Sequence, residues 1–146
     1  MDRPLNRPPA LQLAVRGLHG LAFLVAGVLS FAGWGISGSR SRNSYELVRS
    51  VRSLELLDGA WASLAPVWFA LPLLLAGGLV AAGYGWRWAM TAIGVFVGIL
   101  LIVGWWQVKV SPLRVDTAAA ASAILGACLI VISTVSIFLL RGRSRG

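Results

Sequence analysis

The chain has very few of the side chains on which enzyme chemistry depends. Its 146 residues include one cysteine, one histidine and five acidic residues. The single cysteine, Cys128, excludes an internal disulfide and a Cys-x-x-Cys redox pair. The single histidine, His19, excludes bis-histidine haem ligation within the chain and would leave a metal site short of nitrogen ligands. We therefore expect no catalytic residue, no cofactor and no metal.

The acidic residues are also missing from the long apolar runs. Four such runs cover residues 17–36, 61–83, 88–108 and 118–140, and the acids outside them are Asp2, Glu46, Glu55, Asp58 and Asp116. No buried carboxylate is therefore available to couple protons to transport. A hydrolase triad is not supported either, because a serine, a histidine and an acid cannot meet at one membrane depth without the loop acids.

Each apolar run is long enough to cross about 30 Å of hydrocarbon as a helix, which takes roughly 20 residues. The hydrophobic content of 58% and the mean hydropathy of +0.80 exceed those of a soluble domain of this size. None of the runs shows the two-residue alternation of a membrane-spanning β-strand. The sequence therefore predicts an all-α fold, a polytopic bundle of four transmembrane helices within residues 17–140.

Basic residues flank these predicted helices. With both termini in the cytoplasm, seven arginines face inward and six arginines or lysines face outward, so the positive-inside rule discriminates weakly. Residues 1–16 and the tail RGRSRG at 141–146 carry almost no acid, which favours placing both in the cytoplasm. An alternative for residues 1–36 is a cleaved secretory signal, although the apolar run exceeds the usual signal core.

The net charge of +8 also has two interpretations. Arginines beside apolar helices anchor them and attract anionic lipid head groups. A nucleic-acid-binding protein would instead place a basic stripe, interleaved with aromatic residues, in a soluble domain, and the sequence has none. We therefore expect the lipid bilayer, and no nucleic acid, as a partner.

Tryptophan marks the predicted helix ends. Six of the seven indoles fall there: Trp34, Trp61, Trp86, Trp88, Trp105 and Trp106. An indole at a membrane boundary buries its ring and keeps its N–H in contact with water. We expect an interfacial belt, with a ligand-stacking cluster as the alternative.

Small residues at four-residue spacing predict where the helices pack. Lipid gives helices no hydrophobic reason to associate, so close backbone approach must supply the contact. The candidates are Gly94 with Gly98, then Gly77 with Ala81 and Gly85, and a third series of Ala119, Ala123 and Ala127 beside Ser122 and Gly126. They indicate a compact bundle or docking on another membrane protein.

Pro66 and Pro72 fall within the predicted second helix. Each removes a backbone donor and clashes with the preceding turn, so we expect a kink. Such a kink is either a static bend or, in transporters, a hinge or cavity.

His19 is the single ionisable side chain predicted within a span. It follows Arg16 by three residues, about one helical turn, so we expect it near the cytoplasmic head groups, snorkelling or hydrogen-bonded there. The alternative is a role in ligand binding or proton transfer.

Residues 40–59 lie between the first two predicted spans and are polar. Asn43 and Glu46 have the three-residue spacing of a capping box, and Gly59 is a plausible helix stop. A helix over 44–57 would place Leu47, Val48, Val51 and Leu54 on one face and charged side chains largely opposite. We expect a short amphipathic extracytoplasmic helix that caps the bundle or binds a partner, with Tyr45, Glu46, Arg49, Arg52 and Glu55 as candidate contact residues.

The stretch NSYELVR at 43–49, followed by LELLDG and a Trp- and Pro-containing helix, resembles small four-helix membrane proteins of unknown function from high-GC Gram-positive bacteria. Their corresponding segment is similar to SGYDLVR, and here Ser44 stands where that pattern has glycine. The resemblance covers residues 40–85 at most. It implies a multi-pass protein of a bacterial plasma membrane and carries no activity with it.

Two functions are compatible with these features. The first is a non-enzymatic accessory or scaffold subunit that contacts a larger membrane protein through 40–59. The second is a small transporter or lipid-binding protein that works as a homo-oligomer, with His19 and the segment 66–72 lining a path.

Overall fold

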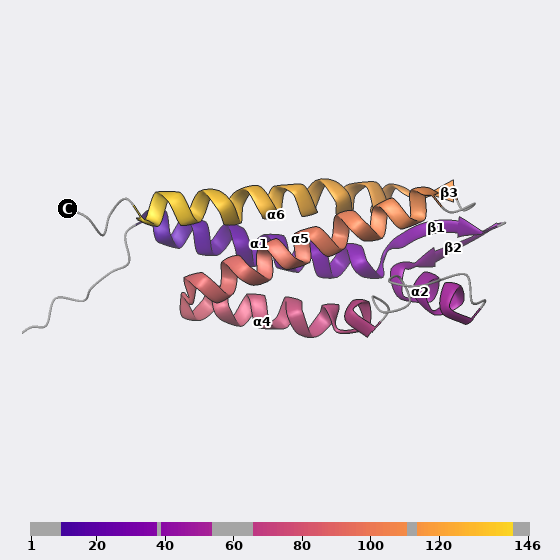
Figure 1. Cartoon of the computed structure of the whole chain (residues 1–146), viewed down its shortest axis with the longest axis horizontal. Helices are drawn as coiled ribbons and strands as arrows, with labels where there is room; N and C mark the ends of the chain where they lie inside the picture. The colour runs from indigo at the N-terminus through magenta and orange to yellow at the C-terminus, as the bar shows by residue number, and fades with distance from the viewer. Residues whose placement is uncertain (1–9, 38, 54–65, 111–113, 142–146) are drawn as a thin grey trace, which may run out of the picture.

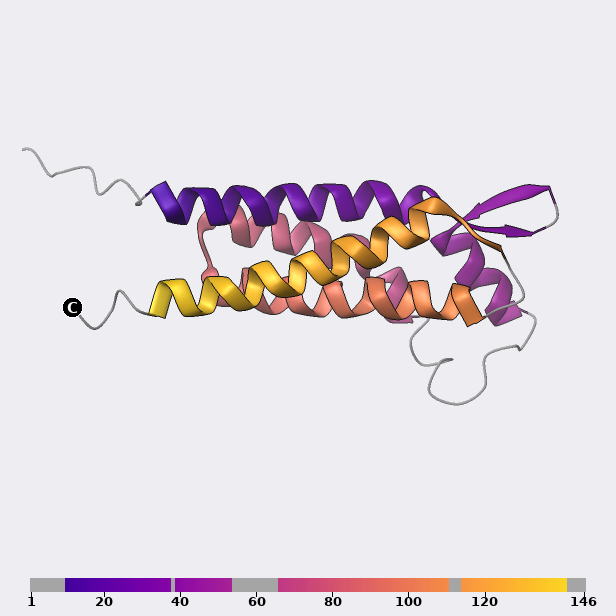
Figure 2. The ribbon, with the colours of Figure 1, turned by 90° about the horizontal axis from the view of Figure 1, so that it is seen from above.

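The computed structural model describes residues 10–37, 39–53, 66–110 and 114–141 of the chain. Long helices dominate: α1 (Ala10–Phe31), α4 (Leu71–Tyr84), α5 (Arg87–Val110) and α6 (Thr117–Arg141). The shorter elements are β1 (Gly33–Ser37), β2 (Arg40–Asn43), α2 (Ser44–Ser53) and β3 (Arg114–Val115). The four long helices run side by side, and the short elements gather at one end, as Figures 1 and 2 show. We call β1, β2, α2 and β3 together the cap.

Within the described residues, three helices are long and apolar enough to cross a membrane, namely α1, α5 and α6. The chain is therefore an integral membrane protein with several helices in the bilayer. The start of α1 and the end of α6 lie at the same end of the bundle, opposite the cap (Figure 1).

The second predicted span differs from expectation. Helix α4 has 14 residues, about 21 Å at 1.5 Å per residue, which is shorter than the hydrocarbon core. A separate helical turn at 66–69 precedes it. Pro72 lies in the first turn of α4, where a missing N–H costs nothing, and Ala70 separates α4 from the helical turn that begins at Pro66. Residues 61–65 of the predicted span lie outside the described residues.

The first span is also displaced. Helix α1 includes residues 10–16, which were expected to precede it, and it ends at Phe31 where a helix to residue 36 was predicted. Residues 33–37 form β1, the central strand of a three-stranded antiparallel sheet with the order β2-β1-β3. An all-α description is therefore incomplete, because the cap contains this sheet.

The sheet register explains the position of Trp34. Gly33 pairs with Asn43 and Gly35 pairs with Arg42, so Trp34 is an extra residue in β1, a β-bulge. A bulge redirects the side chain it carries. The Trp34 indole is consequently buried at the bundle end, where 1% of the residue is exposed.

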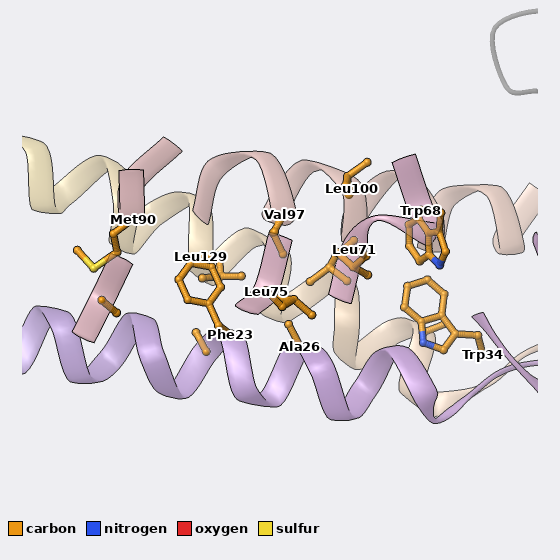
Figure 3. Packing of buried hydrophobic residues seen from close by; sticks show 14 of the residues in the cluster. Phe23, Ala26, Trp34, Trp68, Leu71, Leu75, Met90, Val97, Leu100 and Leu129 are labelled. Atoms are coloured by element: carbon orange, nitrogen blue, oxygen red, sulfur yellow. The ribbon is translucent and has the colours of Figure 1, made fainter. Parts of the chain in front are cut away.

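The bundle core is continuous from α1 to α6. Phe23, Leu75, Val97 and Leu129 come from four different helices and meet in its centre, as Figure 3 shows. The end of the core toward the cap is formed by Trp34 and Trp68, whose rings lie next to each other at the right of Figure 3.

Close backbone approach joins α5 to α6, as the small residues predict. A Cβ added to Gly98 would lie 2.6 Å from the carbonyl oxygen of Gly126, so the two helices touch at these glycines. On α6 the buried face runs through Ala119, Ser122 and Gly126. Of the predicted alanine series, Ala119 is buried and Ala127 is exposed.

The predicted packing pair of α4, Gly77 with Ala81, is only partly in close contact with neighbouring helices. Ala81 is buried, with 1% of the residue exposed. Gly77 has only one loose neighbour, whereas an added Cβ at Gly78 would stand 2.7 Å from the ring of Phe23. The close contact on this helix is therefore one residue further along the chain than the four-residue spacing predicts.

The tryptophans do not form a uniform belt. Trp86, Trp88 and Trp106 are exposed, as an interfacial position requires, but Trp34 is buried in the core. Trp61 lies outside the described residues.

Candidate functional site

The amino end of α2 is closed by a capping box. The Glu46 N–H donates to Asn43 Oδ1 at 2.9 Å, and the Asn43 N–H donates to Glu46 Oε2 at 3.4 Å. These reciprocal bonds satisfy backbone donors that an α-helix leaves unpaired in its first turn. The prediction from the Asn43 and Glu46 spacing is confirmed. Helix α2 is described as far as Ser53, so the predicted end near 57 lies outside the described residues.

Side chains from the cap close the carboxyl end of α1. The Ser44 hydroxyl donates to the carbonyl of Ser30 at 2.6 Å, and the Trp34 indole donates to the carbonyl of Leu29 at 2.7 Å. Carbonyls in the last turn of a helix lack helical partners. The hydrogen bonds that satisfy these carbonyls therefore also hold α2 and β1 at the carboxyl end of α1.

Ser44 also holds the chain before α4. The Trp68 indole N–H donates to Ser44 Oγ at 3.2 Å, so one hydroxyl bridges two segments of the bundle. Ser44 is 2% exposed. Sequence reasoning missed this residue, although a signal exists, because Ser44 shares a helical face with Leu47 and Val48 and a serine there must bury its hydroxyl.

Tyr45 lies between the cap and the bundle. Ser30 Oγ is hydrogen-bonded to the carbonyl of Gly27 and lies 3.2 Å from the Tyr45 hydroxyl, within hydrogen-bond distance. The ring packs near Phe31 and Phe69, with centroids 4.9 and 6.4 Å apart, respectively. Burial raises the pKa of the Tyr45 phenol above its ordinary value of 10.0, opposed by the hydrogen bond to Ser30. Tyr45 therefore belongs to the anchored face of α2.

The opposite face of α2 points to solvent and carries charge. Glu46 and Arg49 are exposed, while Leu47 is buried and Val48 packs against the core. The predicted amphipathic pattern is confirmed for these four residues. Arg52 belongs to α2, but its side chain lies outside the described part, and Glu55 lies outside the described residues.

Arg42 connects β2 to this helix. Its guanidinium donates to Ser50 Oγ at 2.6 Å, and its Nε is buried without a hydrogen-bond partner. Arg40 lies two residues earlier on the same side of β2 and is exposed. Arg40 and Arg49 therefore add exposed positive charge on either side of Arg42.

Asp116, which lies between β3 and α6, connects strands β1 and β2 to the start of α6. Ser41 Oγ donates to Asp116 Oδ2 at 3.2 Å, and the Asp116 N–H donates to the Trp34 carbonyl at 3.0 Å. The other oxygen of Asp116 accepts from the N–H of Thr117 at 2.6 Å, at the amino end of α6. One carboxylate thus caps α6 and holds β2.

His19 lies in the interior of the bundle and does not snorkel to the head groups. The residue has no exposed surface. Its Nδ1 donates to the carbonyl of Val15 at 2.9 Å, because a carbonyl can only accept. Nε2 lies 3.1 Å from Ser133 Oγ, within hydrogen-bond distance. His19 therefore links α1 to α6.

Gly94 on α5 provides the space for this pair. A Cβ at that position would collide with Ser133 Oγ and lie 3.6 Å from His19 Cδ2. The predicted association of His19 with the Pro66 and Pro72 segment is not seen. His19 lies next to Gly94 of α5. Trp68, which belongs to the segment 66–72, is instead hydrogen-bonded to Ser44 at the cap.

Arg16 of α1 forms hydrogen bonds to the carboxyl end of α4. Its Nε donates to the carbonyl of Ala82 at 2.8 Å, and its Nη2 donates to the carbonyl of Gly83. Helix α4 ends at Tyr84 and is capped by Gly85, whose φ of 74° places it in the left-handed region that favours glycine. Arg16 therefore neutralises the negative end of the α4 dipole. From the sequence, Arg16 could be recognised only as a basic residue beside an apolar run, and its bonds to α4 could not be predicted.

Within residues 10–37, 39–53, 66–110 and 114–141, no three histidine, cysteine, aspartate or glutamate residues are grouped so as to hold a metal ion. Comparison of the chain with protein-family models, curated proteins and solved structures finds no match.

Proposed function

We propose that this integral membrane protein is a non-enzymatic accessory or scaffold subunit of a bacterial membrane complex. Both termini lie in the cytoplasm and the cap lies on the outer face. The contact surface for a larger partner protein is the segment 40–59, of which the structure describes 40–53. The exposed charges there are Arg40, Glu46 and Arg49.

The observation that carries this proposal is the one-sided anchoring of α2. Its inner face is held by the Ser44 bonds and by Leu47, while Glu46 and Arg49 remain exposed. A rigid helix that presents fixed charges loses little conformational entropy when a partner binds. Mixed charge on that face suits specific polar contacts better than adhesion to anionic lipid, which favours an all-basic face.

The experiment compares two charge reversals in the cap. Arg49→Glu changes the exposed face of α2, and Arg114→Glu is the matched control because Arg114 is an exposed arginine of β3 outside the segment. Tagged protein purified in mild detergent should carry one larger membrane protein in stoichiometric amount. We expect Arg49→Glu to release it and Arg114→Glu to retain it, with both variants monodisperse. A pure homo-oligomer of the unmodified chain would contradict the proposal.

The second candidate function is a small oligomeric transporter or lipid-binding protein. The observation that favours it is the buried His19–Ser133 pair, since ionisable residues inside a membrane often mark ligand or ion paths. His19→Gln in reconstituted vesicles separates the two candidates. If the His19→Gln variant loses a solute flux across the vesicle membrane that the unmodified chain supports, transport is favoured. The accessory function predicts instead that the larger partner protein still co-purifies with this variant.

A further inference from the structure

An apolar groove opens on the outside of the bundle between α5 and α6. It is shallow and open, has a volume of about 450 Å³, and is lined by Trp88, Thr91, Ala92, Val95, Phe96 and Ile99 of α5, with Ile137 of α6. These α5 residues follow three- and four-residue spacing and so form one face of the helix. Because α5 and α6 both have the length of membrane spans, this groove faces the hydrocarbon of the bilayer.

The groove has the length of one leaflet. Trp88 and Ile99 are eleven residues apart, which is about 16 Å along a helix. Half of the hydrocarbon core is about 15 Å. A single acyl chain from one leaflet therefore matches the groove from end to end.

The end of the groove at Trp88 is positively charged. Arg87 precedes Trp88, is exposed, and begins α5 at the end of the bundle opposite the cap. Arg16 is also at this end but is engaged with the carbonyls that close α4. The acidic residues of the described chain, Glu46 and Asp116, both lie in or beside the cap at the opposite end.

We propose that this groove is a binding site for an anionic phospholipid, with one acyl chain between α5 and α6 and the phosphodiester at Arg87. Basic residues at a membrane surface attract anionic head groups by about 1 kcal/mol each. A second copy of the chain fits less well. In a two-fold dimer within one membrane the same face meets itself, which would bring Arg87 towards Arg87. The site is independent of the role of the cap.

The experiment counts lipids that remain bound in native mass spectrometry after reconstitution in mixed phosphatidylglycerol and phosphatidylcholine nanodiscs. Ala92→Phe fills the groove, and Ala76→Phe is its matched control because Ala76 is an exposed alanine of α4. Arg87→Gln removes the charge, with Arg114→Gln as the matched control at the cap end.

We expect the unmodified chain to retain one phosphatidylglycerol. Ala92→Phe should abolish this retention, while Ala76→Phe keeps it. Arg87→Gln should weaken retention of phosphatidylglycerol about fivefold, the equivalent of about 1 kcal/mol, without weakening that of phosphatidylcholine. Equal retention by Ala92→Phe and Ala76→Phe would overturn the proposal. So would a disulfide-linked dimer formed by Ala92→Cys in a Cys128→Ser background, because a second copy would then occupy the groove.

Discussion

The indole rings of Trp34 and Trp68 meet edge to face, with centroids 5.2 Å apart and planes at 80°, where the cap joins the bundle. Gly104 of α5 lies beneath both, and a Cβ there would stand 2.9 Å from the Trp34 ring and nearer still to that of Trp68. Edge-to-face pairs add about 0.5–1.5 kcal/mol beyond their buried area. The cap and the bundle therefore share one core, and a substitution that disturbs the packing of one should also destabilise the other.

Ser44→Ala tests the anchoring of α2. The substitution leaves the Trp68 indole N–H and the Ser30 carbonyl without the partner that now satisfies both. We expect the free energy of unfolding to fall by about 1–3 kcal/mol, the cost of a buried polar group left unpaired. SDS titration of the protein in mild detergent measures this difference. Ser41→Ala is the control, since its bond to Asp116 is exposed and its loss should cost less.

Gly98→Ala tests the contact between α5 and α6. The added methyl group would lie 2.6 Å from a backbone carbonyl that cannot rotate away, so the two helices must separate. We expect a destabilisation of about 1–3 kcal/mol, as for overpacked cores. Gly17→Ala should be neutral or stabilising in the same assay, because nothing lies within 4 Å of a Cβ at that position. Equal stability of the two variants would contradict the close approach.

The His19–Ser133 bond is best measured by a double-mutant cycle. His19→Leu, Ser133→Ala and the double variant isolate the coupling between the two side chains. We expect a coupling of about 0.6 kcal/mol and at most about 1.7 kcal/mol, because hydrogen bonds between membrane helices are modest. A coupling of zero would mean that the two side chains do not bond in the folded protein.

Tyr45 gives the protein a dependence on alkaline pH. Burial raises the phenol pKa in the folded chain, so the folded state holds this proton more tightly than the unfolded state. Stability should therefore fall as the pH rises through the ordinary value of 10.0 towards the raised value. Thermal unfolding from about pH 9 to about pH 11 measures the slope, and Tyr45→Phe should make it shallower. An unchanged slope in that variant would contradict the burial of the phenol.

Local signals in the sequence predicted the local features well. The apolar runs located α5 and α6, and they located α1 with both of its ends displaced, because a span needs a minimum apolar length to cross the bilayer. The Asn43 and Glu46 spacing located the start of α2, because a capping box involves residues only three apart.

Features that depend on distant parts of the chain were not predicted. Strand β1 is short and contains two glycines; it pairs with β2, which follows it closely in the chain, and with β3, about eighty residues later. Nothing near residues 33–37 in the sequence signals that partner, so helix was extended through them. The burial of His19 likewise depends on Gly94 and Ser133 from two other helices. Apolar content alone could not distinguish this interior position from one at the head groups.

The pairing of β1 with β3 has a consequence for biogenesis. Residues 114–115 follow α5 in the chain, so the sheet can close only after α5 has been synthesised. A binding partner that recognises the closed cap would therefore bind only chains whose synthesis has passed α5.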